Sequence, residues 1–195
     1  MTTPASESDQ RSDDALMAAY AAGDAGAATI LTERLLPLAW RVARRMLGDQ
    51  GDAEDIAQDA MLRLWRIAPE WEPGRARVST WVYRVTTNLC TDRLRRNREV
   101  AMGDEMPEQI DPSADAVAQL TTAARAAALN AALEDLPERQ RQAVILRHLE
   151  GLANPEIAEI MDIGVEAVES LTARGKRQLT LALKGRKHAL GYADD

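Results

Sequence analysis

Apolar residues recur along this chain at every third or fourth position, the spacing of amphipathic helices, and no run alternates as a half-buried strand would. In the stretch 27–47 one apolar stripe is formed by Ile30, Leu31, Leu35, Leu38, Val42 and Met46. Gly48 is expected to end this helix, and Pro37 is expected to kink it. The pattern predicts an all-α protein.

Three more helices are predicted in the first half of the chain, over residues 14–22, 52–67 and 80–96. Pro69, Pro73 and Gly74 enforce a loop over 68–78, and Ser79 or Thr80 is expected to cap the helix that follows. Each of these helices has one apolar face, so together they can enclose a small core.

The second half shows the order of a helix-turn-helix unit. Helices resume near residue 116, and Pro137 opens a helix over 138–149 that Gly151 closes. Asn154 and Pro155 start a short helix ending near Met161, and a tight turn leads into a long helix over 165–183. With Ala158 at the crossing and Val168 facing the core, this pattern predicts a final helix that lies in a DNA groove.

Charge divides the chain into the same two halves. Two basic helical stretches, 84–98 and 174–187, flank the segment 99–124, which holds six acidic residues and no basic one. The division predicts two small helical domains, 14–98 and 116–187, joined by a flexible acidic linker, 99–115. The remaining residues are expected to be a disordered leader, 1–13, and a tail, 188–195.

Composition narrows the classes of function. The chain has 31 acidic against 24 basic residues, so it is a poor non-specific DNA binder, and any DNA contact must be local. Cys90 is the single cysteine, which excludes an intramolecular disulfide and favours a buried structural role. No signal peptide and no membrane-spanning stretch are evident, so we expect a soluble cytoplasmic protein without membrane insertion.

Polar side chains gather on one face of the predicted helix 52–67. Asp55, Gln58, Asp59 and Leu62 follow one another at helical spacing. A solvated acidic face is the simpler interpretation. A carboxylate–metal enzyme using Asp55, Asp59 and Asp92 is a remote alternative, because no second carboxylate helix with a histidine completes such a site.

An aromatic and basic surface is predicted next to it. The loop carries Trp71, Arg75 and Arg77, and the helix that follows carries Trp81 together with the outward residues Arg84, Asn88, Arg95 and Arg96. Such a surface suits single-stranded DNA, because bases stack on aromatic rings while arginines hold phosphates. For Trp81 and Tyr83, ordinary packing is an alternative role.

The long final helix carries the third candidate surface. Ser170, Arg174, Lys176 and Arg177 are expected to be exposed and to contact DNA. Glu166 and Glu169 in its first turn would repel phosphates, but glutamate accepts from cytosine N4 in the major groove. Complementing the positive end of the helix is an equally good role for them.

Several blocks of residues resemble bacterial extracytoplasmic-function (ECF) sigma factors. GDQGDAEDIAQDAMLRLWR (48–66), STWVYRV (79–85), NL (88–89) and DRLRR (92–96) are similar to region 2 of that family. LEDLPERQR (133–141), GL (151–152), EIAEI (156–160) and VEAVESL (165–171) are similar to region 4. The resemblance covers most of residues 14–183, with the two motif sets in the family's order.

The resemblance implies a role for each surface. The face of Asp55, Gln58, Asp59, Leu62 and Arg63 would bind the β′ clamp helices of core RNA polymerase, and the second domain would meet the β flap. The helix 81–96 and its preceding loop would capture the melted minus-ten element, and the final helix would read the minus-thirty-five element as duplex. Such a protein is no enzyme, needs no cofactor, and is commonly controlled by an anti-sigma factor.

A stand-alone helix-turn-helix regulator is the main alternative. It would use the final helix alone and usually dimerise. It leaves the block 52–98 unexplained, and the sequence offers no evident dimerisation heptads.

Overall fold

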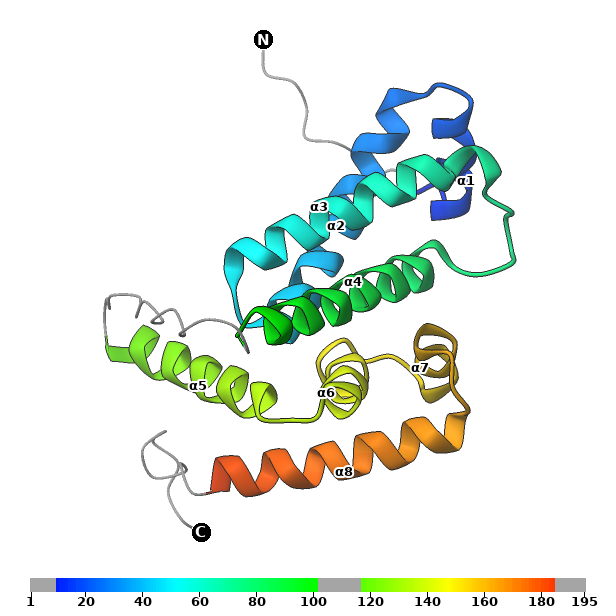
Figure 1. Ribbon diagram of the computed structural model, residues 1–195. Helices are drawn as coiled ribbons and strands as arrows, with labels where there is room; N and C mark the ends of the chain where they lie inside the picture. The colour runs from blue at the N-terminus through cyan, green and yellow to red at the C-terminus, as the bar shows by residue number, and fades with distance from the viewer. Residues whose placement is uncertain (1–9, 102–116, 185–195) are drawn as a thin grey trace.

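The computed structural model describes residues 10–101 and 117–184, with side chains described over 10–99 and 125–184. Every element within these ranges is helical, as predicted (Figure 1). The elements are α1 (Asp13–Ala21), α2 (Ala25–Leu47), α3 (Gln50–Ile67), η1 (Ala68–Glu70), α4 (Val78–Ala101), α5 (Val117–Glu134), α6 (Glu138–Val144), η2 (Ile145–Leu149), α7 (Asn154–Met161) and α8 (Val165–Lys184).

The first domain is built around α2, which packs against α1, α3 and α4. Its predicted stripe is buried at Leu31, Leu35, Val42 and Met46, while Ile30 and Leu38 are partly buried at the edges of that stripe. Pro37 lies on the exposed side and does not end the helix. Gly48 ends α2 with a φ of 76°, as the sequence predicted.

Short polar side chains begin three of these helices. Ser12 Oγ accepts from Ala15 N at 3.2 Å, Asp24 Oδ1 from Gly26 N at 2.9 Å and Asp49 Oδ1 from Asp52 N at 2.7 Å. The prediction that Ser79 or Thr80 caps α4 is wrong. The helix already begins at the buried Val78, so Ser79 and Thr80 lie within its first turn.

Helices α1 and α4 extend past the residues predicted for the first domain. Residues 10–12 of the expected leader precede α1 directly, and Ser12 and Asp13 form its start. At the other end, α4 continues to Ala101, beyond the predicted start of the linker. Most of the linker, 102–116, the first nine residues and the tail, 185–195, lie outside the described residues.

The second domain packs α6 and α7 against α8, with α5 alongside. Its core includes Leu133, Leu146, Ile157, Ile160 and Val168, all at most 2% exposed. The predicted helix 138–149 is two elements, because the chain widens into the π-helical turn η2, in which Glu150 N donates to Ile145 O.

The start of α7 also differs from its predicted form. Ala153, not Asn154, occupies the cap position, and the Glu156 carboxylate accepts from Ala153 N at 3.1 Å. At the other end of α7, Asp162 takes a left-handed conformation with a φ of 53°, which a short polar side chain tolerates. Val168 of α8 then points into the core, as the helix-turn-helix pattern predicted.

Candidate nucleic-acid interface

The polar face of α3 is turned toward solvent. Asp55, Gln58 and Arg63 are exposed, and the apolar Leu62 is 54% exposed. Asp59 accepts from Arg63 one turn later at 3.2 and 3.3 Å, so two members of the face hold one another in place. An exposed leucine beside carboxylates is available for contact with a protein partner.

The outer face of α4 presents the predicted basic residues. Arg84, Asn88, Arg95 and Arg96 are all exposed. Arg95 pairs within the helix with Asp92 at 3.1 Å, and Arg84 pairs with Asp162 of the second domain at 3.5 Å. Opposite them, Cys90 is fully buried, and burial raises the pKa of its thiol to about 12, so Cys90 packs as a small apolar residue.

The two predicted tryptophans of this surface lie against each other. The rings of Trp71 and Trp81 meet edge to face, with centroids 6.4 Å apart. Both are partly buried and pack against the core, which agrees with the packing alternative for Trp81. Trp71 also donates from Nε1 to Asp14 Oδ1 of α1 at 2.9 Å.

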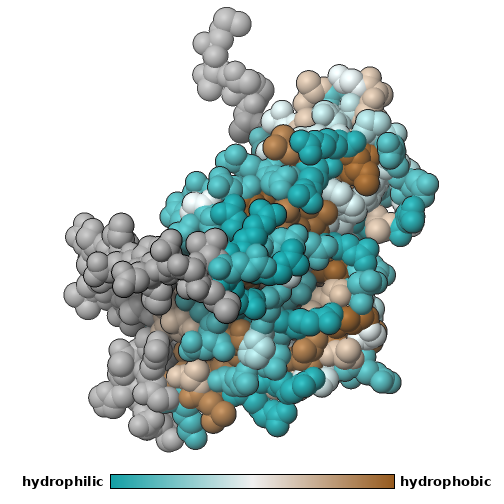
Figure 2. Space-filling model, viewed as in Figure 1, coloured by the Kyte–Doolittle hydropathy of each residue, from teal (hydrophilic) through white to brown (hydrophobic). Residues whose placement is uncertain are grey.

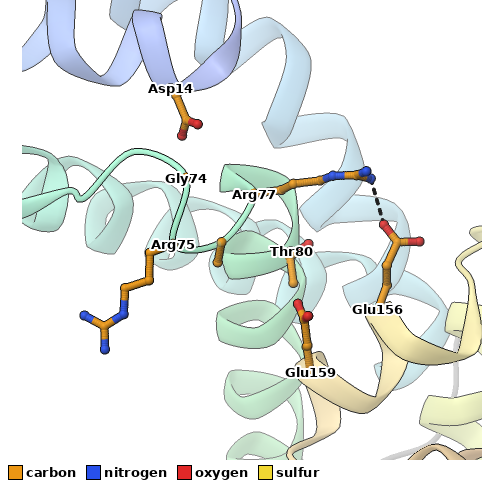
Figure 3. A pocket seen from close by; sticks show the side chains of 8 residues that line it. Asp14, Gly74, Arg75, Arg77, Thr80, Glu156 and Glu159 are labelled. Carbon is orange, nitrogen blue, oxygen red and sulfur yellow. Dashed lines mark hydrogen bonds and ion pairs between the residues drawn. The ribbon is translucent and has the colours of Figure 1, made fainter.

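Arg75 and Arg77 border a cavity of about 310 Å³ between the loop and α7 (Figure 3). Arg77 points across it to Glu156 and pairs with that carboxylate at 2.9 Å, while Arg75 points away from α7. Asp14, Thr80 and Glu159 also line the cavity. The basic loop therefore faces solvent on one side and acidic residues of the second domain on the other.

Helix α8 exposes all six residues predicted to meet duplex DNA, Glu166, Glu169, Ser170, Arg174, Lys176 and Arg177. Arg174 donates to Ser170 Oγ at 2.9 Å, and Glu169 accepts from Asn154 of α7 at 3.3 Å. On the inner side of α8, Gly175 touches α6 so closely that an added Cβ would stand 2.6 Å from Val144 Cγ2. The glycine thereby sets how near the two helices lie.

The face shown in Figure 2 is largely hydrophilic, with hydrophobic residues in separate patches. Within the described part of the chain, no three His, Cys, Asp or Glu side chains converge on a possible metal site. Nor does any helix of residues 10–101 and 117–184 combine the length and apolarity needed to cross a bilayer.

Comparison with known proteins decides the family. The model of sigma-70 region 2 matches residues 31–100, and that of sigma-70 region 4 matches residues 126–179. The ECF RNA polymerase sigma factor SigM of Mycobacterium tuberculosis is 36% identical over 174 residues, covering 89% of this chain and 86% of that protein. The chain belongs to the ECF sigma factor family.

Other relatives agree with this assignment. The ECF sigma factor SigE of Mycolicibacterium smegmatis is 37% identical over 144 residues, which span 72% of this chain but only 55% of SigE. Among solved structures, CnrH in complex with the cytosolic domain of CnrY has 25% identity and a TM-score of 0.65, with 89% of this chain and 97% of CnrH covered. RpoE of Bartonella quintana shares the fold, with 24% identity, a TM-score of 0.64 and coverage of 78% and 94%.

Family membership sets the other two interpretations aside. Sigma factors are transcription initiation factors and not enzymes, which excludes the carboxylate–metal enzyme. The region 2 match also accounts for the block 52–98, which a stand-alone regulator left unexplained.

The two domains of this sigma factor meet at a buried carboxylate that the sequence analysis missed. Glu150 follows η2, and its side chain is 2% exposed. It accepts from Arg41 at 3.1 Å, from the Tyr83 hydroxyl at 3.2 Å and from Arg45. Burial, and next to it the Glu150 charge, raises the pKa of the Tyr83 phenol above its ordinary value.

Several ion pairs between described residues cross this junction with the same polarity. Besides those of Glu150, they join Arg77 to Glu156, Arg84 to Asp162, and Arg98 to Glu138 at 2.7 Å. In each pair the first domain supplies the arginine and the second domain the carboxylate. The sequence shows two basic stretches, but it does not show which carboxylates pair with the arginines. Arg41 and Arg45 lie more than 100 residues from Glu150, so their pairing leaves no local sequence pattern.

A buried arginine completes the junction. Arg141 of α6 donates to Met46 O at 2.7 Å and also to Glu134 O, the last residue of α5. It therefore satisfies carbonyls at the C-terminal ends of two helices, where a cation is favoured. Burial lowers the pKa of its guanidinium, while the Glu134 carboxylate opposes that effect.

Proposed function

We propose that this ECF sigma factor binds core RNA polymerase through the α3 face formed by Asp55, Gln58, Asp59, Leu62 and Arg63. The observation that carries the proposal is that matches to both sigma-70 regions fall on separate domains whose outward faces hold the expected residues. The half-exposed Leu62 supplies apolar contact area. The carboxylates around it would fix the orientation of the bound polymerase through charged contacts.

The same proposal assigns DNA contacts to the other two faces. The loop with Arg75 and Arg77, together with the outer face of α4, would hold the melted minus-ten strand, with Asn88 contacting a base. Trp71 and Trp81 would support this surface from beneath, because their rings pack on one another. Helix α8 would read duplex DNA at the minus-thirty-five element with Arg174, Lys176 and Arg177 on phosphates and Glu166, Glu169 and Ser170 near base edges.

Control by an anti-sigma factor in the cytoplasm belongs to the same proposal. It is supported by the solved structure of CnrH, a protein of similar fold in complex with the cytosolic domain of CnrY. The chain itself already brings its two domains together through Glu150. Two DNA elements some 25 base pairs apart, about 85 Å along B-DNA, would require these domains to separate.

Two single substitutions test the assignment of surfaces. Asp59→Ala should weaken binding to core polymerase at least about tenfold, because it removes a carboxylate from the contact face and frees Arg63. Asn88→Ala should leave polymerase affinity unchanged and lower the yield of open promoter complexes, because Asn88 lies on the other helix. Fluorescence titration with core polymerase and permanganate footprinting measure the two steps.

The two variants are controls for one another, since both residues lie at the surface of the same domain. Circular dichroism should show the wild-type fold for each. If both variants lost the same step, or if neither lost any, the assigned surfaces would be wrong.

A further inference from the structure

The loop between η1 and α4, residues 71–77, carries exposed arginines on a chain segment with few side chains in the core. Glu72, Pro73, Gly74, Arg75 and Arg77 are all exposed. Gly74 turns the loop with a φ of 83°, and Arg75 N donates to Glu72 O at 3.3 Å within the turn. A loop of this kind needs an outside support if its arginines are to keep one geometry.

Trp71 at the start of the loop provides that support. Its ring meets Trp81 of α4 edge to face, which fixes the ring from one side. Its indole N–H donates to Asp14 Oδ1 at 2.9 Å, a partner 57 residues earlier in the chain. Because the acceptor is a carboxylate in a partly buried position, this bond is stronger than a neutral hydrogen bond at the surface.

Asp14 is itself held firmly by the surrounding structure. It lies in the first turn of α1, which Ser12 caps and whose Leu16 and Met17 are fully buried. The neighbouring Asp13 pairs with Arg34 of α2 at 2.8 Å, which fastens the start of α1 to the centre of the domain. Asp14 therefore offers Trp71 an acceptor that cannot easily move away.

We propose that Asp14 is a positioning residue that holds the loop 71–77, and thereby Arg75 and Arg77, in the geometry that captures the melted promoter strand. The DNA role of the loop rests on the function proposed above; the anchoring of the loop by Asp14 does not. Asp14 also borders the cavity beside Arg75 and Arg77 (Figure 3). Loss of the hydrogen bond from Trp71 to Asp14 would therefore change the position of the loop beside this cavity.

Asp14→Ala should release the loop while leaving the domain folded. Tryptic cleavage after Arg75, followed by mass spectrometry on the full chain, should become roughly tenfold faster, the equivalent of one charge-assisted hydrogen bond. In the holoenzyme the variant should bind core polymerase normally and form roughly tenfold fewer open complexes at limiting concentration.

Matched variants separate the hydrogen bond from its surroundings. Glu33→Ala removes an exposed carboxylate of α2 in the same domain and should leave cleavage after Arg75 unchanged. Asp14→Asn keeps an acceptor oxygen without the charge and should restore part of the protection. Trp71→Phe removes the donor, so adding Asp14→Ala to it should have little further effect.

The outcomes distinguish this proposal from the function on which it draws. Unchanged cleavage in Asp14→Ala would overturn the anchoring, and faster cleavage with normal open complexes would overturn the positioning role. Faster cleavage without additivity in the double variant, combined with fewer open complexes, supports it. If the wild-type protein gave no transcription with core polymerase, the proposed function would fail, while the cleavage results would still report on the anchor.

Discussion

Replacing Glu150 by alanine should separate the two domains of the isolated sigma factor. The Glu150 side chain is 2% exposed and accepts from Arg41, Arg45 and Tyr83, so its loss leaves three donors of the first domain without their acceptor. Arg41 and Arg45 are 45% and 29% exposed and can recover water, so we expect a loss of about 3 kcal/mol, at the low end for a buried pair. The ratio of closed to open molecules would fall about a hundredfold.

Small-angle X-ray scattering of the full chain measures this change directly. The Glu150→Ala protein should show a larger radius of gyration than wild type, with unchanged helix content by circular dichroism. Glu159→Ala is the matched control, because Glu159 is an exposed carboxylate on α7. Identical scattering from wild type and Glu150→Ala would mean that Glu150 does not hold the domains together.

Separation of the two domains should also change the affinity of the protein for DNA. Arg77 and Arg84 pair with Glu156 and Asp162 in the closed arrangement, so their charge is partly neutralised by the second domain. In the open Glu150→Ala protein these arginines would be available to phosphates, and affinity for single-stranded promoter DNA should rise in low salt.

Removing Arg141 should lower the stability of the folded protein. Arg141→Ala leaves the Met46 and Glu134 carbonyls without their charged donor and opens space at a buried site. Hydrogen bonds to charged groups contribute about 1.5–3 kcal/mol each, so we expect the free energy of unfolding to fall by about 3 kcal/mol. For a chain of this size, the melting temperature should drop by about 6–12 °C.

Thermal unfolding followed by circular dichroism measures this loss, and Arg139→Ala supplies the control. Arg139 lies exposed on the same helix, so its removal should change stability by less than about 0.5 kcal/mol. Arg141→Lys should fall between wild type and alanine, because lysine keeps the charge without the planar fork. Equal melting temperatures for Arg141→Ala and Arg139→Ala would contradict the capping role of Arg141.

The periodicity of the sequence predicted much of this fold, because burial of one helical face is a local property. Val168 faces the core and Gly48 ends α2 as the spacing indicated. Two predicted caps were wrong: α4 already begins at the buried Val78, before Ser79, and the Glu156 carboxylate accepts from Ala153 N at the start of α7, where Asn154 was expected to be the cap.

The candidate surfaces were also predictable from the sequence only in part. Helical spacing was enough to predict that Asp55, Asn88 and Arg174 are exposed, since exposure follows from the position of the apolar stripe. It was not enough to predict the junction of Glu150 with Arg41, Arg45 and Tyr83, because that contact depends on how two separate domains meet. The bond from Trp71 to Asp14 was hidden because the two residues lie 57 positions apart in the sequence, although both belong to the first domain.

The most direct test of the central claim is run-off transcription with purified core RNA polymerase on a library of promoter fragments. The account predicts discrete transcripts from a subset of fragments when this protein is added, and none of them with core polymerase alone. A transcript pattern that is the same with and without the protein would contradict it.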